Sequence, residues 1–216
     1  MSLDEAKSAS GAAVVVDVMR AFTTAAWAFH LGAAQIVLVA ELDEALALKA
    51  TTPGTLAFCD GSPKPGFDLA NSPGELLSLD VAGRTVVQRT TSGTRRALAA
   101  RDCSPLFCTG FVCAAATANA LRRAEVPSVS FVLGGGDEDW ACAEYIAALL
   151  AEEAPGLEFV ERARKSTAAA ELLGLVDGGF KGVDARDVDM CLELDRFDFA
   201  IQSTAEDGRL ILSPIK

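Results

Sequence analysis

The sequence predicts an α/β fold with a mostly parallel sheet and helices on both faces. Short apolar runs alternate with helix-like segments almost without exception up to residue 151, and this alternation is typical of parallel sheets. The run at residues 12–16 is apolar throughout, as expected of a strand that helices cover on both faces. Half of the 216 residues are hydrophobic, enough for one sizeable core. We therefore expect residues 1–216 to form a single α/β domain, with room for a smaller C-terminal subdomain from about residue 155.

The apolar runs predict six strands before the last third of the chain. They lie at residues 12–16, 35–40, 55–59, 84–89, 104–108 and 128–133. Helices are predicted between and after them, at residues 21–31, 41–50, 95–101, 112–124 and 138–151. Gly32 is a typical helix stop, and acidic residues begin the second and the last of these helices.

Shorter elements follow from local signals. Ser72 can cap a short helix in which Pro73 takes the first position. In the last third we expect helices at 166–173 and 184–193 and a terminal strand near 210–212. No internal repeat or low-complexity tract interrupts the chain.

Charge and cysteine content limit the class of function. The net charge is −11 and the isoelectric point is near 4.6, so the global field repels nucleic acid and we expect no nucleic-acid partner. A small anion can still bind where local cations or a metal ion gather. Six cysteines without a C-x-x-C pair indicate reduced, mostly buried thiols. With no apolar run long enough to span a bilayer and no visible signal peptide, we expect a cytoplasmic protein that does not bind membranes.

The segment at residues 86–95 is the clearest functional signal. A β-branched strand ends in Thr90-Thr91-Ser92-Gly93-Thr94, directly before a helix. Free N–H groups at a helix start, the helix dipole and the hydroxyls together suit an oxyanion such as phosphate. An ordinary strand-to-helix turn, in which Thr and Ser only cap the helix, is the alternative interpretation.

Polar residues also follow the other predicted strands. Ligands of open parallel sheets bind beyond the carboxyl ends of the strands, so we expect these residues to lie along one edge. Oxygen ligands suited to Mg²⁺ come from Asp17, Asp68, Glu138 and Asp139. Arg20 offers a planar fork of donors to phosphate or sulfonate. Neutral donors come from Asn71, Ser72, Thr90, Thr91 and Thr94.

Structural roles are the alternatives at the charged positions. Asp17 can cap the next helix, Glu138 and Asp139 can complement a helix dipole, and Arg20 can join a surface ion pair. Several mechanisms lack the necessary residues. His30 is the only histidine, which leaves no Ser-His-Asp triad, and the chain has neither a nucleotide P-loop nor a thiol-phosphatase loop.

Five ordered segments resemble a known family. They read VVVDVMRAFTTA, GFDLANSP, VVQRTTSGTRRAL, TGFVCAAATANAL and EDWACAEYIAALL, and their order resembles that of the 2-phosphosulfolactate phosphatase family, also called the ComB family. The resemblance covers roughly residues 12–194. It implies an α/β fold peculiar to that family and a Mg²⁺-dependent phosphatase that hydrolyses 2-phosphosulfolactate to 3-sulfolactate and phosphate, a step towards coenzyme M.

The resemblance also implies roles for individual residues. Asp17, Arg20 and Asp68 would be catalytic, and Asp17, Glu138 and Asp139 would hold the metal. Substrate would be bound by Asn71, Ser72, Thr90, Thr91, Ser92, Gly93 and Thr94. Whether Asp17 is a nucleophile or only a metal ligand stays open at this point.

This chain departs from the family pattern at several positions. Ser92 and Cys113 stand where asparagine is usual, Ala70 stands where glycine is usual, Cys59-Asp60-Gly61 replaces a Gly-Glu pair, and the histidine expected near Ser166 is absent, with Ala168 nearby. Loss of amides removes hydrogen-bond donors, and such groups discriminate strongly between substrates. A similar small anionic phosphomonoester is therefore an open alternative as substrate.

A non-catalytic anion-binding or sensing protein is the second hypothesis, and a structural protein with a decayed site is a weaker third. The apolar last third is compatible with a homodimer.

Overall fold

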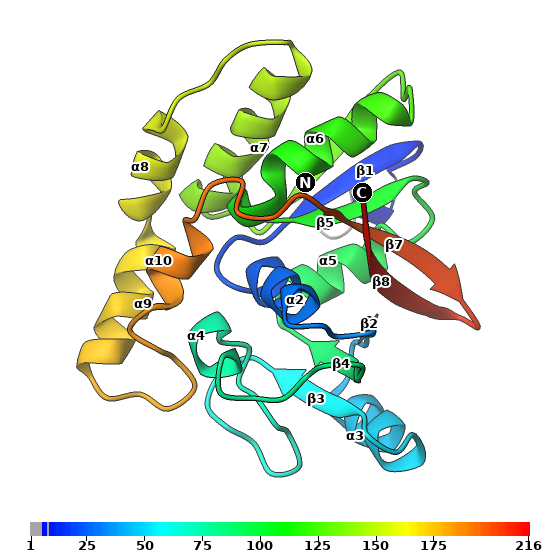
Figure 1. Ribbon diagram of the computed structural model, residues 1–216, viewed down its shortest axis with the longest axis vertical. Helices are drawn as coiled ribbons and strands as arrows, with labels where there is room; N and C mark the ends of the chain where they lie inside the picture. Colours follow the sequence, from blue (N-terminus) through cyan, green and yellow to red (C-terminus); the bar gives the residue numbers. More distant parts are fainter. Residues whose placement is uncertain (1–5, 8) are drawn as a thin grey trace.

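A computed structural model describes residues 6–7 and 9–216 of the chain. Within these residues eight strands form a single sheet, in the order β3-β4-β2-β8-β7-β5-β1-β6. Figure 1 shows this sheet with helices packed against it. The predicted α/β class is confirmed.

The six strands predicted from apolar runs are all present, with bounds that shift by up to two residues. They are β1 (Ala12–Val16), β2 (Gln35–Leu38), β3 (Leu56–Cys59), β4 (Thr85–Arg89), β5 (Leu106–Thr109) and β6 (Val129–Leu133). They form two parallel groups, β3-β4-β2 and β5-β1-β6. Within each group the carboxyl ends of the strands point to one edge. The two groups run in opposite directions along the sheet, because three antiparallel pairings lie between them, so the expectation of a single shared edge is correct only within each group.

The last two strands join these groups. β7 (Ala200–Glu206) and β8 (Arg209–Ile215) form an antiparallel hairpin. β8 pairs with β2, and β7 pairs with β5. The predicted strand at 210–212 is therefore longer than expected, and β7 was not predicted because its sequence AIQSTAE is largely polar. Residues 204–209 pair only within the hairpin, which explains why polar side chains suffice there.

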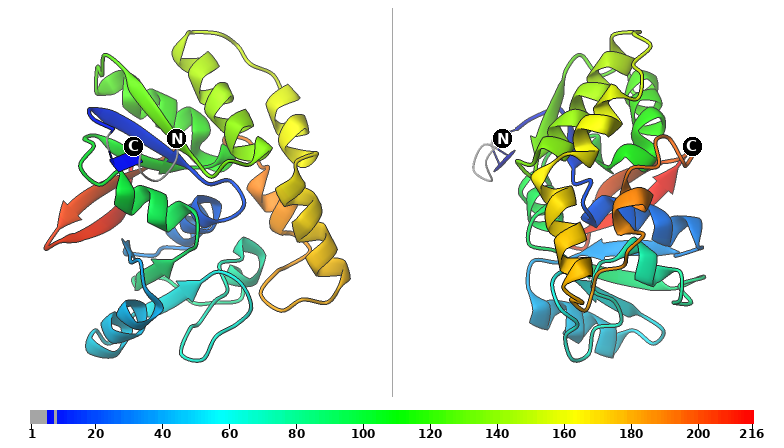
Figure 2. Two further views of the ribbon diagram at one scale, coloured as in Figure 1. Left: turned by 180° about the vertical axis from the view of Figure 1, so that it is seen from behind. Right: turned by 90° about the vertical axis from the view of Figure 1, so that its left-hand side faces the viewer.

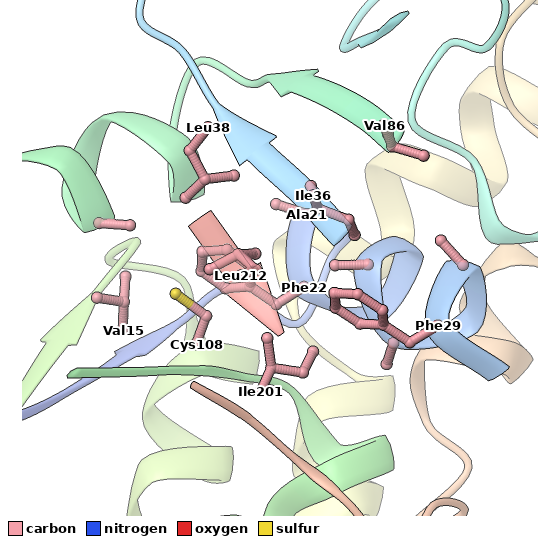
Figure 3. Packing of buried hydrophobic residues seen from close by; sticks show 14 of the residues in the cluster. Val15, Ala21, Phe22, Phe29, Ile36, Leu38, Val86, Cys108, Ile201 and Leu212 are labelled. Atoms are coloured by element: carbon pink, nitrogen blue, oxygen red, sulfur yellow. The ribbon is translucent and has the colours of Figure 1, made fainter. Parts of the chain in front are cut away.

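Helices pack on both faces of the sheet. The larger core lies between one face and the helices α2 (Ala21–His30), α4 (Pro73–Leu76) and α5 (Gly93–Ala99). Figure 3 shows Phe22 of α2 among Leu38, Ile201 and Leu212 from three different strands. Full burial of a side chain such as Phe22 contributes about 2–3 kcal/mol.

The other face carries two separate apolar clusters. A short 3₁₀ turn at Phe111–Cys113 leads into α6 (Ala114–Arg123), which with α7 (Asp137–Leu150) covers β1 and β5. α3 (Leu42–Thr51) covers β2 and β4. The helix predicted at 112–124 therefore begins with a 3₁₀ turn.

A helical arm from the last third runs past the carboxyl ends of the strands. It consists of α8 (Glu158–Arg164), α9 (Thr167–Asp177) and α10 (Asp187–Cys191). α8 packs on α7, and α10 contacts both α9 and α4 (Figures 1 and 2). α8 was not predicted, and α9 and α10 correspond to the expected helices with different bounds.

Two general features complete the fold. The helices of the described residues are all too short or too polar to cross a membrane. The six cysteines, all of them in the described part of the chain, are buried free thiols, as expected.

Candidate active site

A cavity of about 140 Å³ lies beyond the carboxyl ends of the strands. Its lining comes from segments far apart in the sequence: Asp17, Met19, Arg20, Ala21, Asp60, Asn71, Thr90, Ser92 and Leu172. The predicted residues Asp17, Arg20, Asn71, Thr90 and Ser92 are thus brought together around one cavity. α9 contributes Leu172, so the helical arm forms part of the wall.

Asp17 follows β1 directly and is 5% exposed. Its Oδ1 accepts the Ala21 N–H at 2.8 Å, so the carboxylate does cap α2. Burial raises the pKa of Asp17, while hydrogen bonds from the Ala21 N–H, the Ser92 hydroxyl and the Gly93 N–H oppose that rise. The carboxyl group is thus oriented by the Ala21 N–H, lies close to Ser92 and Gly93, and still borders the cavity.

A chain of hydrogen bonds beside Asp17 joins the segments that follow three strands. The Arg96 Nη1 donates to the Ser92 Oγ at 2.7 Å, and its Nη2 donates to the Gly134 carbonyl at 3.2 Å. The N–H of Gly134 donates to Asp139 Oδ2, and the N–H of Val18 donates to Asp139 Oδ1, both at 2.9 Å. This chain of bonds ends at Val18, the residue after Asp17, and it connects the loops after β1, β4 and β6.

Arg20 is held by a partner that the sequence did not reveal. Its Nη1 donates to Asp187 Oδ2 at 2.6 Å and to the Gly182 carbonyl at 3.0 Å. The side chains of Arg20 and Asp187 are 9% and 1% exposed, so this is a buried ion pair and not a surface one. The Nε and Nη2 of Arg20 have no hydrogen-bond partner within the described residues, which leaves them available to an anion.

Asn71 and Ser72 follow β3 but differ in their availability. Asn71 is 3% exposed, and its Oδ1 accepts from Gln88 Nε2 at 2.8 Å. Within the described part of the chain its Nδ2 donates to no protein group, so it remains a donor at the cavity. The Ser72 hydroxyl donates to Asp187 at 2.7 Å and caps α4 by accepting the Glu75 N–H. The structure therefore gives Ser72 a capping role.

The predicted oxyanion turn satisfies most of its own donors. The Thr90 hydroxyl donates to the Thr94 Oγ1 at 3.0 Å and accepts the Thr94 N–H, and the Thr94 Oγ1 also accepts the Thr90 N–H. The N–H of Gly93 is directed at Asp17. A Cβ on Gly93 would lie 2.8 Å from Asp17 Oδ2, which explains the glycine. The turn thus binds an anion, but that anion is the carboxylate of Asp17.

Seven predicted residues lie outside the cavity wall: Asp68, Ser72, Thr91, Gly93, Thr94, Glu138 and Asp139. Asp68 lies beside Ala57 in β3, where its carboxylate pairs with Lys49 Nζ at 2.7 Å and accepts the Ala57 N–H at 2.8 Å. Thr91 is exposed, and its N–H donates to Asp60 Oδ2 at 2.6 Å. The expectation that Asp68 lies at the shared edge is corrected, because the chain runs back alongside β3 before it reaches Asn71.

Glu138 and Asp139 begin α7 and are nearly buried, at 5% and 3% exposed. Burial raises the pKa of Glu138, and burial together with the nearby Asp17 holds the pKa of Asp139 well above its usual range. Both oxygens of Asp139 are bound to backbone N–H groups, whereas Glu138 Oε2 is buried without a partner.

A divalent cation fits part of this acidic group. Within the described residues, no three His, Cys, Asp or Glu side chains are arranged to hold a metal. Mg²⁺, however, usually takes one or two carboxylates together with water and substrate oxygens. The unpartnered Glu138 oxygen and the neighbouring Asp17 carboxylate are suited to that role, and Asp139 is better suited to fixing the loops.

Arg96 and Asp187 were missed in the sequence, and Asp60 was noted as a polar residue after a strand but was given no role. Asp60 follows β3 immediately and borders the cavity, so its place after a strand was a usable signal. Arg96 lies one helical turn after Ser92, and this spacing puts both on one face. Asp187 is 167 residues from Arg20, and no local pattern connects them.

The departures from the family pattern lie in different surroundings. Ser92 borders the cavity, but Cys113 is buried in the apolar core and does not. Ala168 lies one turn before Leu172 on α9, the helix that reaches the cavity. Ala168 and Leu172 share a helix face, so the histidine that is absent here would lie on the face of α9 that forms the cavity wall.

Comparisons with known proteins agree with this architecture. Residues 2–205 match the family model described as 2-phosphosulpholactate phosphatase. A protein of Bacillus subtilis (strain 168), named probable 2-phosphosulfolactate phosphatase, is 34% identical over 91% of this chain and 88% of its own length. A protein of the same name from Carboxydothermus hydrogenoformans is 34% identical over 93% of this chain and 90% of its own. Another from Thermus thermophilus is 39% identical over 64% of this chain and 60% of its own length.

Proposed function

Because the chain belongs to the 2-phosphosulpholactate phosphatase family, we propose that it is a Mg²⁺-dependent phosphatase. Its substrate is 2-phosphosulfolactate or a similar small anionic phosphomonoester, which it hydrolyses to 3-sulfolactate, or the corresponding alcohol, and phosphate. The proposal includes a cytoplasmic location and a step towards coenzyme M, which rest on the resemblance alone.

One observation carries the proposal. Asp17 and Arg20 lie in the loop after β1, Asn71 lies in the segment after β3, and all three border the same cavity of about 140 Å³. A carboxylate, free guanidinium nitrogens and a free amide are the groups that a phosphate monoester requires. Because all three groups face one cavity, they can bind the same ligand, which separate structural roles would not require.

The side chains divide the work of phosphate transfer. Arg20 binds phosphate oxygens through Nε and Nη2, while its ion pair with Asp187 holds the guanidinium in place. Asn71 donates a neutral hydrogen bond to the substrate. Asp17 either attacks phosphorus or orients the attacking water. Fixed donors of this kind stabilise charge as it develops in the transition state.

The acidic side chains give the site its metal dependence. Asp17 and Glu138 are the residues that would hold Mg²⁺, and the ion would supply positive charge against the phosphoryl oxygens. Without a cation the negative charges of Asp17 and Glu138 repel each other, and water screens this repulsion little because both side chains are nearly buried.

The test is hydrolysis of 2-phosphosulfolactate and a panel of small phosphomonoesters, measured as released phosphate with and without Mg²⁺. We expect turnover that EDTA removes and Mg²⁺ restores. Absence of hydrolysis across the panel would contradict the proposal.

A thermal-shift series separates catalysis from simple anion binding. If the alternative of a binding or sensing protein holds, substrate raises the melting temperature without phosphate release. That alternative is supported by the self-satisfied Thr90–Thr94 turn, which offers the substrate few donors of its own.

A further inference from the structure

Arg96 lies at the acidic group but makes no ion pair with it in the described part of the chain. Its guanidinium bonds to a hydroxyl and a carbonyl, Ser92 Oγ and Gly134 O. Its Nε is buried without an acceptor. By contrast, Arg20 is paired with Asp187 and Arg89 with Asp60. Arg96 therefore keeps an uncompensated positive charge near Asp17.

The direction of the hydrogen bonds gives Arg96 a specific effect. Because Arg96 Nη1 donates to Ser92 Oγ at 2.7 Å, the Ser92 hydroxyl proton is free to point elsewhere. Ser92 and Asp17 line the same cavity, and a Cβ on the adjacent Gly93 would lie 2.8 Å from Asp17 Oδ2, so the Ser92 hydroxyl is close to the carboxylate. In agreement with this, the Ser92 side chain lowers the pKa of Asp17. A guanidinium has no acceptor, so this order cannot reverse. Arg96 thus fixes the orientation of Ser92, and Ser92 fixes one side of the Asp17 carboxylate.

The second hydrogen bond makes the arrangement rigid. Arg96 Nη2 holds the carbonyl of Gly134, and Asp139 holds the N–H of the same residue. A Cβ on Gly134 would lie 2.2 Å from Asp139 Oδ2, so only glycine fits between them. The guanidinium is therefore anchored to a loop that does not itself border the cavity.

We propose that Arg96 is a positioning residue for the phosphatase reaction, acting through Ser92 to orient Asp17 and supplying a positive charge beside the buried carboxylates. This inference rests on the proposed function. Arg96 does not line the cavity. Its substitution is therefore expected to change the rate of the reaction but to leave substrate binding nearly unchanged.

The experiment is a double-mutant cycle on purified full-length protein. Arg96→Met is expected to lower kcat about 10- to 100-fold, the range seen when a supporting hydrogen-bond partner is lost, with KM changed less than about threefold. Arg96→Lys restores the charge and one donor but not the fork, so kcat should lie between wild type and Arg96→Met. Ser92→Ala removes the intermediate hydroxyl. In the double variant Ser92→Ala/Arg96→Met, kcat should fall no more than about threefold below the more impaired single variant, because both changes break the same connection.

Controls separate positioning from folding. Arg123→Met removes an exposed arginine at the end of α6 and should leave kcat unchanged. Melting temperatures and circular dichroism show whether Arg96→Met is folded, and Arg96→Lys carries the test if it is not. Multiplying effects in the double variant, or wild-type kcat in both Arg96 variants, would overturn the inference while leaving the proposed function intact. No turnover by wild type would overturn both.

Discussion

At the scale of single residues, burial and orientation decide which predicted groups can act. Asp17, Arg20 and Asn71 border the cavity with polar atoms that can still bind a ligand. The side chains of Ser72 and Thr94 are instead hydrogen-bonded to other groups of the protein. A buried polar group must be hydrogen-bonded, so the question at each position is whether the partner is protein or ligand. Only the groups with spare donors or acceptors remain candidates for chemistry.

Asp68 and Asp17 provide a direct comparison. Asp68→Ala should change kcat by less than about threefold, because its carboxylate pairs with Lys49 away from the cavity. The same substitution at Asp17 should reduce kcat by about 10³-fold or more, the order expected when a central catalytic group is lost. Released phosphate measured at saturating substrate checks both. An equal loss of kcat in the two variants would show that Asp68 is part of the active site.

At the scale of elements, short helices and their caps hold the site residues. α4 has only four residues, too few to be stable alone, and its start is fixed by Ser72 and Asp187. Asp187 begins α10 and also binds Arg20, so the helical arm positions a cavity residue. This explains why α9 and α10, poorly defined by local sequence, are nevertheless part of the site.

Removal of the α4 cap should measure this coupling. Ser72→Ala loses a capping oxygen and leaves Asp187 with one donor fewer, so the free energy of unfolding should fall by about 1–2 kcal/mol. Ser78→Ala, at an exposed position after α4, is the control and should change it by less than about 0.5 kcal/mol. Urea unfolding gives both values. Equal stabilities of the two variants would show that the cap contributes nothing.

The segment before α10 should respond to acid. Hydrogen bonds from Arg186 lower the pKa of Asp184 to about 2. Between about pH 4 and pH 2 the unfolded chain therefore binds more protons than the folded one, so the contribution of Asp184 is present above pH 4 and is lost as the pH falls towards 2. Asp184→Asn should be less stable than wild type at pH 7, and the difference should shrink below pH 4. Urea unfolding at pH 7, 5 and 3 checks this, and a difference that does not depend on pH would contradict it.

At the scale of the whole molecule, the C-terminal hairpin unites the sheet. β8 and β7 stand between the two parallel groups, so a cavity built from both depends on the last residues of the chain. Asp17 comes from one group, and Asn71 and Thr90 follow strands of the other. The two halves of the site cannot keep their spacing unless the hairpin is in place.

Leu212 in β8 tests this dependence. It is fully buried opposite Ile36 of β2, so Leu212→Ala should lower the free energy of unfolding by about 2–5 kcal/mol. The neighbouring Ser213 points to the other, partly exposed face, and Ser213→Ala should change stability by less than about 0.5 kcal/mol. Chemical denaturation measures both, and a loss below about 1 kcal/mol for Leu212→Ala would contradict a central role for the hairpin.

The sequence by itself determined the elements with strong local signals. The largely apolar runs located six strands, because strands covered on both faces bury mostly apolar side chains. The sequence also predicted that Asp17, Arg20, Asn71, Thr90 and Ser92 lie close together, and they border one cavity. The single parallel edge that was the reason for this prediction is not present, because the two groups of strands run in opposite directions. The cap at Ser72 was visible because such bonds span only three residues.

Only the tertiary structure decided which partners these residues take. The polar strand β7 is specified by pairing with β5 and β8, which no local pattern encodes. Asp68 forms an ion pair with Lys49, and Asp187 forms one with Arg20. The polar groups of the Thr90–Thr94 turn bind one another and lie against Asp17. Hydrogen bonds and ion pairs depend on distances of a few ångströms in space, and residues far apart in the chain acquire those distances only when the sheet is assembled.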